Sequence, residues 1–229
     1  MTTGPADPDT PSTWDLSTSE AIELQKRLAG QVRIEPLPAD ARLIAGADVS
    51  ILKARNELIA GVVLWDLQER KVVEQTVVRG QARFPYVSGL LSFREAPAVL
   101  KAFEELRHQP DVALFDGQGY AHPRRFGLAC HLGVLLNMPS IGCAKSRLIG
   151  EYVEPASPRG SWTDLVHGDE AIGAVLRTRD GISPLYISIG HRANLRTSID
   201  LVLRCCTRYR LPEPTRLAHQ LVTAEKTRI

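Results

Sequence analysis

The sequence of 229 residues contains no run of about 18 apolar residues and no hydrophobic segment of the signal-peptide kind. A helix that crosses a membrane needs about 20 mostly apolar residues in a row. Nothing in the pattern therefore favours a membrane partner. We expect a soluble protein located in the cytoplasm.

Cysteine is scarce as well. The four cysteines, Cys130, Cys143, Cys205 and Cys206, show no CxxC spacing, and two of them are adjacent. Zinc sites and the disulfide frameworks of small secreted domains both need a more regular pattern. We therefore expect buried free thiols in a reducing compartment.

Neither sign of charge is in large excess: 28 Lys and Arg residues face 26 Asp and Glu residues, which gives a formal net charge of +2. A net charge this small does not establish a polyanionic partner, so a nucleic-acid partner has to be inferred from local motifs. No GxGxxG motif follows a predicted strand, which disfavours a Rossmann-type metabolite enzyme.

The chain is 44% hydrophobic and 24% charged, and it is long enough to bury a substantial core. It has no internal repeat and no segment that resembles a linker. Residues 1–14 are rich in Pro, Thr and Asp, and we predict that they form a disordered N-terminal tail. Residues 15–229 are predicted to form a single α/β domain with a mixed sheet flanked by helices.

Hydrophobic periodicity predicts how the elements follow one another. Three strands with short links imply an antiparallel meander, and a later strand–helix–strand order implies a parallel pair. The segment 148–169 is expected to be irregular. The predicted strands are 43–51, 58–67, 72–78, 112–115, 140–144, 171–177 and 185–189. The predicted helices are 17–28, 94–108, 126–137, 195–209 and a short one after Pro214.

The stretch FPYVSGLLSFREAP, residues 84–97, changes from an extended, turn-prone segment into a helix. Because proline is tolerated best in a first turn, Pro97 places the start of this predicted helix near Arg94. Glu95 then lies in the first turn, on the same face as the apolar stripe. A carboxylate in line with a buried stripe is costly unless something pairs with it, so Glu95 is a candidate functional residue.

Two aspartates are equally out of place. Asp48 lies in LIAGADVSIL among small and apolar neighbours, and Asp116 ends the apolar run VALFD. Each of them could simply cap a turn or pair with an arginine, and the helix dipole favours a glutamate in a first turn. If Asp48, Asp116 and Glu95 converge, their mutual repulsion raises their pKa values unless a cation neutralises them. Oxygen ligands select hard ions, so we expect Mg²⁺, with Mn²⁺ as a substitute, and hydrolysis of a phosphodiester.

Further candidates follow the predicted strands. The loop DGQGYAHPRR, residues 116–125, contains glycines that allow a close backbone approach and arginines that could grip phosphate. The alternative is a turn with a solvated basic tip. Lys145 follows a buried strand at the same sheet edge, where stabilisation of a transition state competes with plain solvation. His219 is a weaker candidate, because most lone histidines are structural.

The turn Pro85-Tyr86-Val87-Ser88 presents an aromatic and a β-branched residue just before the helix. In most globular proteins such a tyrosine is simply buried. In an enzyme that acts on nucleic acid, the same turn could enter the double helix and hold open the gap left by an extruded base.

The chain resembles the endonuclease V family of deoxyinosine-directed repair nucleases over about residues 24–222. The resemblance implies a ribonuclease H-like fold and a divalent-metal-dependent endodeoxyribonuclease. It further implies cleavage of the second phosphodiester bond on the 3′ side of deoxyinosine, leaving 3′-hydroxyl and 5′-phosphate ends. The signatures that carry it are GADVS, FPYVSGLLSFREAP, FDGQGYAHPRRFGLA, SIGCAKSRL, YISIGHR and RYRLPEPTRLAH.

The resemblance also implies roles for individual residues. The family's metal carboxylates match Asp48 and Asp116, its catalytic glutamate matches Glu95, and its active-site lysine and histidine match Lys145 and His219. Its strand-separating wedge matches Pro85, Tyr86, Val87 and Ser88, and its contacts to the flipped base match Gly89, Leu91 and Gly117, with His122 grouped beside them.

This chain departs from the family pattern at two positions, and the relatives vary among themselves at a third. The wedge ends in Ser88 where proline is common, and Ile51 stands where many relatives have Phe or Tyr. Some relatives have aspartate in place of His219. These departures bear on the shape of the wedge, on base preference and on the role of His219.

Two rival functions remain open at this point. One is an inosine-specific endoribonuclease that acts on single-stranded RNA, because contacts to a 2′-hydroxyl cannot be read from the sequence. The other is a lesion-binding protein without catalysis, although a mere binder gains nothing from a costly acidic cluster. A monomer that binds damaged DNA is the expected state.

Overall fold

The computed structural model describes residues 14–228. Most of the segment for which a disordered tail is expected, residues 1–13, lies outside the described residues, as does Ile229. The strands are β1 (Leu43–Leu52), β2 (Glu57–Asp66), β3 (Lys71–Gln81), β4 (Val112–Phe115), β5 (Ser140–Ala144), β6 (Trp162–His167), β7 (Glu170–Leu176) and β8 (Leu185–Ile189). The helices are α1 (Thr18–Ala29), α2 (Leu91–Glu104), α3 (Leu128–Leu136), α4 (Leu195–Cys205) and α5 (Glu213–Thr227), with a 3₁₀ turn η1 (Lys53–Arg55).

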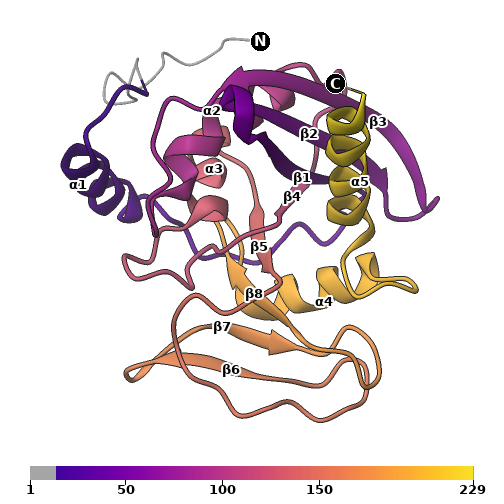
Figure 1. Cartoon of the computed structure of the whole chain (residues 1–229). Coiled ribbons are helices and arrows are strands. Elements are labelled where there is room, and N and C mark those ends of the chain that lie inside the picture. The colour runs from indigo at the N-terminus through magenta and orange to yellow at the C-terminus, as the bar shows by residue number, and fades with distance from the viewer. Residues whose placement is uncertain (1–13, 229) are drawn as a thin grey trace.

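The eight strands found in residues 14–228 form one mixed sheet in the order β3-β2-β1-β4-β5-β8-β7-β6 (Figure 1). The expected antiparallel meander is confirmed in β1, β2 and β3, and β4 pairs in parallel with both β1 and β5. Strands β8, β7 and β6 continue the sheet in antiparallel fashion. The predicted mixed sheet flanked by helices, of the ribonuclease H-like kind, is thus confirmed.

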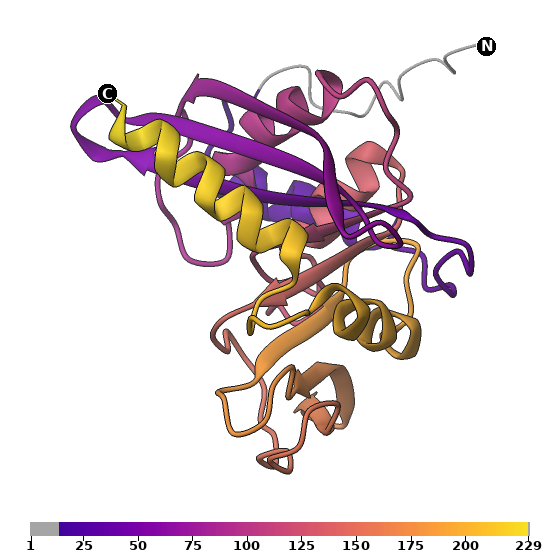
Figure 2. The same cartoon turned by 90° about the vertical axis from the view of Figure 1, so that its right-hand side faces the viewer.

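Alternation along β1 assigns the helices to two faces of the sheet. Ala45 and Ala47 point into a core shared with α2 and α3. Gly46, between them, faces α5 so closely that a Cβ atom there would lie 2.1 Å from the carbonyl carbon of Pro214. Asp48, two residues further on, therefore points to the α5 side. Figure 2 shows α5 lying along the strands of the meander, with α2 behind them.

Helix α2 corrects the prediction for residues 94–108. It begins at Leu91, so Pro97 lies inside it and cannot donate the hydrogen bond to the carbonyl of Phe93. Burial compensates, because the Phe93 ring is 1% exposed and packs 5.6 Å from the ring of Phe84. Glu95 consequently lies in the second turn and not, as expected, in the first.

The end of α2 also differs from the prediction. The helix stops at Glu104, four residues before His108. The carboxylate of Glu74 on β3 accepts the backbone N–H groups of Arg107 and His108 at 3.0 and 3.2 Å, which draws the chain out of the helical path. These hydrogen bonds lower the pKa of Glu74 to about 2.

Three further predictions were wrong. The segment 148–169 is not entirely irregular, because β6 occupies Trp162–His167 as an edge strand in which only Leu165 is buried. The last helix is not short: α5 spans Glu213–Thr227, with Pro214 in its first turn, where the missing N–H costs nothing. Helix α4 ends at Cys205, four residues earlier than expected.

Two expectations from composition can also be compared with the fold. The four cysteines are buried and free, as predicted. Among the helices of residues 14–228, none combines the length and the apolar character that crossing a bilayer requires.

Candidate active site

The strand register brings the two candidate aspartates together. Ala47 of β1 pairs in parallel with Phe115 of β4, so Asp48 and Asp116 follow at neighbouring positions. Burial raises the pKa of Asp48, and the charge of Asp116 adds to that rise. A hydrogen bond from His219 opposes it.

Glu95 reaches the same place from α2. Burial raises the pKa of its carboxyl group from 4.5 to about 8, and the negative charges of Asp48 and Asp116 contribute to this rise, while Arg94 opposes it. Within residues 14–228 the Glu95 carboxylate has no hydrogen-bond or ion-pair partner. The three carboxylates therefore interact, and Glu95 lacks the direct partner that Asp48 and Asp116 each have.

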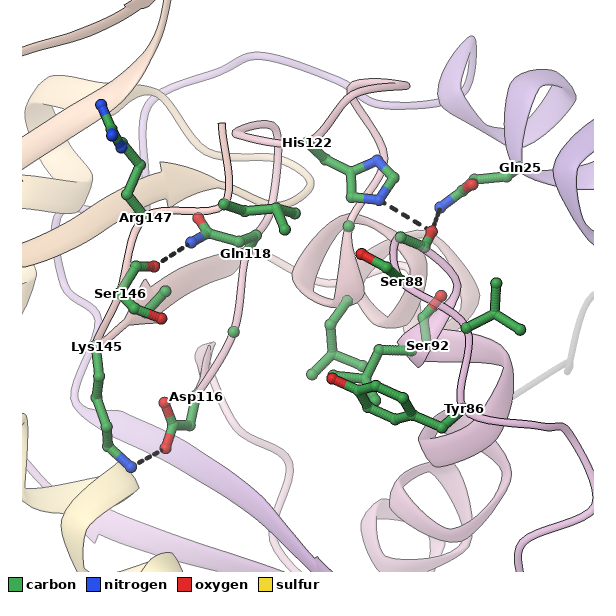
Figure 3. A pocket seen from close by; sticks show the side chains of 18 residues that line it. Gln25, Tyr86, Ser88, Ser92, Asp116, Gln118, His122, Lys145, Ser146 and Arg147 are labelled. Atoms are coloured by element: carbon green, nitrogen blue, oxygen red, sulfur yellow. Dashed lines mark hydrogen bonds and ion pairs between the residues drawn. The ribbon is translucent and has the colours of Figure 1, made fainter. Parts of the chain in front are cut away.

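Two of the three carboxylates pair with basic side chains of the protein itself. Lys145, just after β5, forms an ion pair with Asp116, which Figure 3 marks with a dashed line. His219, on α5, lies 2.8 Å through Nδ1 from Oδ2 of Asp48. The expected position of Lys145 near the carboxylates is thus confirmed. The close fit of α5 against Gly46 is what brings His219 within reach of Asp48.

The oxygen donors of Asp48, Asp116 and Glu95 could hold a divalent cation. Among residues 14–228, no three His, Cys, Asp or Glu side chains stand together as a ready-made metal cluster. The residues nevertheless fit a hard cation, because the donors are carboxylate oxygens and because Glu95 is partly buried without a partner. A bound cation would relieve the repulsion that raises the pKa values of Glu95 and Asp48.

A pocket of about 370 Å³ opens beside Asp116 and Lys145. Figure 3 shows these two residues on one side and Tyr86, Ser88 and Ser92 on the other. Its volume is in the range of sites that bind small ligands. Its lining includes every residue that the sequence suggested for lesion binding except Pro85, namely Tyr86, Val87, Ser88, Gly89, Leu91, Gly117 and His122.

The predicted wedge, residues 85–88, lies at the rim of this pocket. Tyr86 is 78% exposed, so the alternative of a tyrosine buried in the core does not hold. Pro85 and Ser88 are also exposed, and Val87 is half-buried. A large aromatic ring thus projects from the surface next to a pocket that ends at Asp116.

The loop 116–125 does not end in a solvated basic tip. Arg124 donates through Nη2 to the carbonyl of Gly89 at 2.8 Å, and Arg125 forms an ion pair of 2.8 Å with Glu170. His122 is 3% exposed, and burial lowers the pKa of its imidazole to about 4. Both guanidinium groups therefore bind protein groups, which leaves them unsuited to grip phosphate in this arrangement.

Sequence reasoning missed several residues around the pocket. Gln25 of α1, Gln118, Ser146 and Arg147 all line it. Arg210 holds the backbone of Lys145 in place, because its Nη2 donates a hydrogen bond to the carbonyl of Lys145 at 2.9 Å. Only Gln25 carried a signal that could have been read, since it is a polar residue within the apolar stripe of Ala21, Leu24 and Leu28.

Comparisons with known proteins match the chain to one family. A family model described as Endonuclease V matches residues 26–220. The chain is 48% identical over 214 residues to endonuclease V of Trichormus variabilis, covering 93% of this chain and 97% of that protein. The crystal structure of endonuclease V from Streptomyces avermitilis matches with a TM-score of 0.91 at 40% identity, covering 95% of this chain and 96% of that one.

A further structural match is endonuclease V of Ciona intestinalis in complex with a 24mer DNA that contains an inosine followed by a ribo-adenosine. The TM-score is 0.81 at 26% identity, and the match covers 92% of this chain and 98% of that one. The family model spans far more than half of the sequence, and the relatives match over nearly their whole length. This chain belongs to the endonuclease V family of nucleases.

Proposed function

We propose that this protein is a metal-dependent endonuclease that recognises deoxyinosine in DNA and hydrolyses the second phosphodiester bond on its 3′ side. The products would carry 3′-hydroxyl and 5′-phosphate ends. The observation that carries the proposal is the pocket, which joins the exposed Tyr86 at its rim to Asp116 and Lys145 at its end. The inosine-containing DNA bound by the Ciona intestinalis relative supports the choice of substrate.

Asp48, Asp116 and Glu95 would hold Mg²⁺, for which Mn²⁺ would substitute. Their oxygen donors, and the burial of the Glu95 carboxyl group without a hydrogen-bond partner, support this assignment. When bound, the cation would supply positive charge for a phosphate oxygen and would lower the pKa of a water molecule.

Three side chains would carry out the other steps of the hydrolysis. Glu95 would either bind the cation or orient the attacking water through its carboxylate. Lys145, whose ammonium already pairs with Asp116, would stabilise the negative charge that develops on the scissile phosphate. His219, 2.8 Å from Asp48, would relay a proton.

Lesion recognition would begin with extrusion of the base. Residues 85–88 would enter the duplex, with Tyr86 filling the gap left by the flipped nucleotide. An inosine pair is weaker than a normal pair, so opening it costs less. The pocket lined by Gly89, Leu91, Gly117 and His122 would then receive hypoxanthine and read its 6-oxo and N1–H edge.

The metal assignment is tested by Asp116→Ala. This variant should lose nicking of an inosine duplex in Mg²⁺, because both a cation ligand and the partner of Lys145 are removed, while binding of the duplex in Ca²⁺ remains measurable. Asp200→Ala is a matched control, because Asp200 is exposed on α4, where it pairs with Arg196. Undiminished nicking by Asp116→Ala would refute the assignment.

A second candidate is cleavage of inosine-containing RNA. One observation favours it: the DNA bound by the Ciona intestinalis relative carries a ribo-adenosine directly after the inosine. In the proposed reaction the 2′-hydroxyl of that nucleotide is adjacent to the scissile phosphate. Matched strands with deoxyadenosine or adenosine after the inosine, assayed side by side, separate the two preferences.

A further inference from the structure

One backbone carbonyl beside the pocket accepts hydrogen bonds from three side chains. The oxygen of Gly89 lies 3.1 Å from Nε2 of Gln25, 3.0 Å from Nε2 of His122 and 2.8 Å from Nη2 of Arg124. Figure 3 shows the lines from Gln25 and His122 ending on this oxygen. A carbonyl group has two lone pairs, so three donors saturate it.

The three donors are fixed by one another. Gln25 is fully buried, its Nε2 also donates to the carbonyl of Phe126 at 2.6 Å, and its Oε1 accepts from Nε of Arg124. The backbone N–H of Arg124 donates to Nδ1 of His122 at 3.2 Å, which leaves the ring proton on Nε2, facing Gly89. Every polar atom of the Gln25 side chain is therefore engaged.

Gly89 joins the wedge to helix α2, so holding its carbonyl group fixes the position of both. Gly89 lies between the wedge, residues 85–88, and Leu91, the first residue of α2. Its φ of 77° is in the left-handed region, and a Cβ atom there would lie 3.0 Å from Nη2 of Arg124. The carbonyl is thus the fixed point from which the exposed Tyr86 extends in one direction and Glu95 in the other.

We propose that Gln25, together with His122 and Arg124, is a positioning residue for lesion recognition, and that α1 is thereby part of the recognition machinery. The inference rests on the proposed function. Gln25 holds the carbonyl of Gly89, and through it the wedge, in the geometry needed to open a duplex. Because it acts at the base of the wedge, its effect is largest on substrates that have to be opened.

A purely structural role would look different. A buried glutamine in an apolar stripe costs free energy unless it is fully hydrogen-bonded, and an apolar side chain would pack α1 at no such cost. If Gln25 only held α1 in place, any substitution that loosens α1 to the same degree would have the same consequence. Leu28 provides that comparison, because it is also a buried residue of α1 and its apolar side chain cannot donate a hydrogen bond to Gly89.

The experiment compares Gln25→Met with Leu28→Ala on inosine in a duplex and inosine in a single strand. For Gln25→Met we expect kcat/KM to fall at least about tenfold on the duplex, mainly through KM, and less than about threefold on the single strand. Leu28→Ala should leave the ratio between the two substrates unchanged. Equal losses on both substrates, or the same ratio change in Leu28→Ala, would overturn the inference.

A second measurement is independent of nuclease activity. Hydrogen exchange of residues 84–92 should become at least about tenfold faster in Gln25→Met than in Leu28→Ala, because only the former releases Gly89. Arg124→Met should reproduce this result if Gln25→Met does not fold. Unchanged exchange overturns the inference, whereas a wild-type protein that nicks neither inosine substrate refutes the proposed function instead.

Discussion

Replacing Glu95 with glutamine should stabilise the metal-free protein, and the gain should depend on pH. The carboxyl group has a pKa of about 8 in the folded protein against an ordinary value of 4.5. It is therefore harder to ionise in the folded state than in the unfolded chain. Below pH 4.5 the carboxyl group is protonated in both states, and the protein keeps its full stability. Above pH 4.5 the unfolded chain ionises more readily than the folded protein, so the stability of the folded wild type is lost as the pH rises through about 8.

The magnitude follows from the shift. Each pH unit between these two pKa values costs about 1.4 kcal/mol, which sets an upper limit of about 5 kcal/mol at pH 8 and above. Partial access of water to the side chain reduces this figure, and we expect about 2–3 kcal/mol. For a chain of this size that corresponds to roughly 5–10 °C in Tm.

The assay is thermal or urea unfolding of both proteins in EDTA at several values between pH 5 and pH 9. The two curves should lie closest together at pH 5, and the advantage of Glu95→Gln should grow as the pH rises and level off by about pH 8. Glu104→Gln is the control, because Glu104 is an exposed glutamate on the same helix. Saturating Mg²⁺ should narrow the gap by stabilising the wild type. A gap that is constant with pH would refute the electrostatic account.

Two further predictions concern packing and the wedge. Gly46→Ala should destabilise the protein by about 1–3 kcal/mol in urea unfolding, because the new Cβ atom would meet the backbone of Pro214. Gly80→Ala is the control, because a Cβ atom there would lie 3.7 Å from its nearest neighbour, and an equal loss of stability in this variant would contradict the prediction. Tyr86→Ala should leave Tm unchanged, because the ring is 78% exposed, and should weaken binding of an inosine duplex at least about tenfold by gel shift. Unaltered duplex binding would rule out Tyr86 as the leading residue of the wedge.

The sequence was most informative where one local pattern dominates. The meander, β4 and β5 follow from apolar runs bounded by turns, and the capping box at Ser17 and Glu20 starts α1 as expected. It was least informative where tertiary packing overrides a local rule. Burial of Phe93 carries α2 through Pro97, and Glu74 ends that helix by capturing backbone groups from a distant strand.

The site shows the same division. The three carboxylates could be picked out because each is chemically out of place among its neighbours, and Lys145 because it follows a strand at the same sheet edge. Gln25 is out of place in its apolar stripe in the same way, but its role could not be assigned, and Arg210 gave no such signal. Each of them acts by holding a backbone carbonyl remote in sequence, that of Gly89 and that of Lys145 respectively. Which carbonyl a side chain will hold depends on the packing of whole elements.

The central claim is tested most directly by mapping the cut in an end-labelled duplex that contains a single deoxyinosine. The account predicts one nick at the second phosphodiester bond 3′ to the lesion, with 3′-hydroxyl and 5′-phosphate ends, in Mg²⁺ and not in EDTA. Cleavage that is equally fast in EDTA, or equally fast in a matched duplex without inosine, would contradict it.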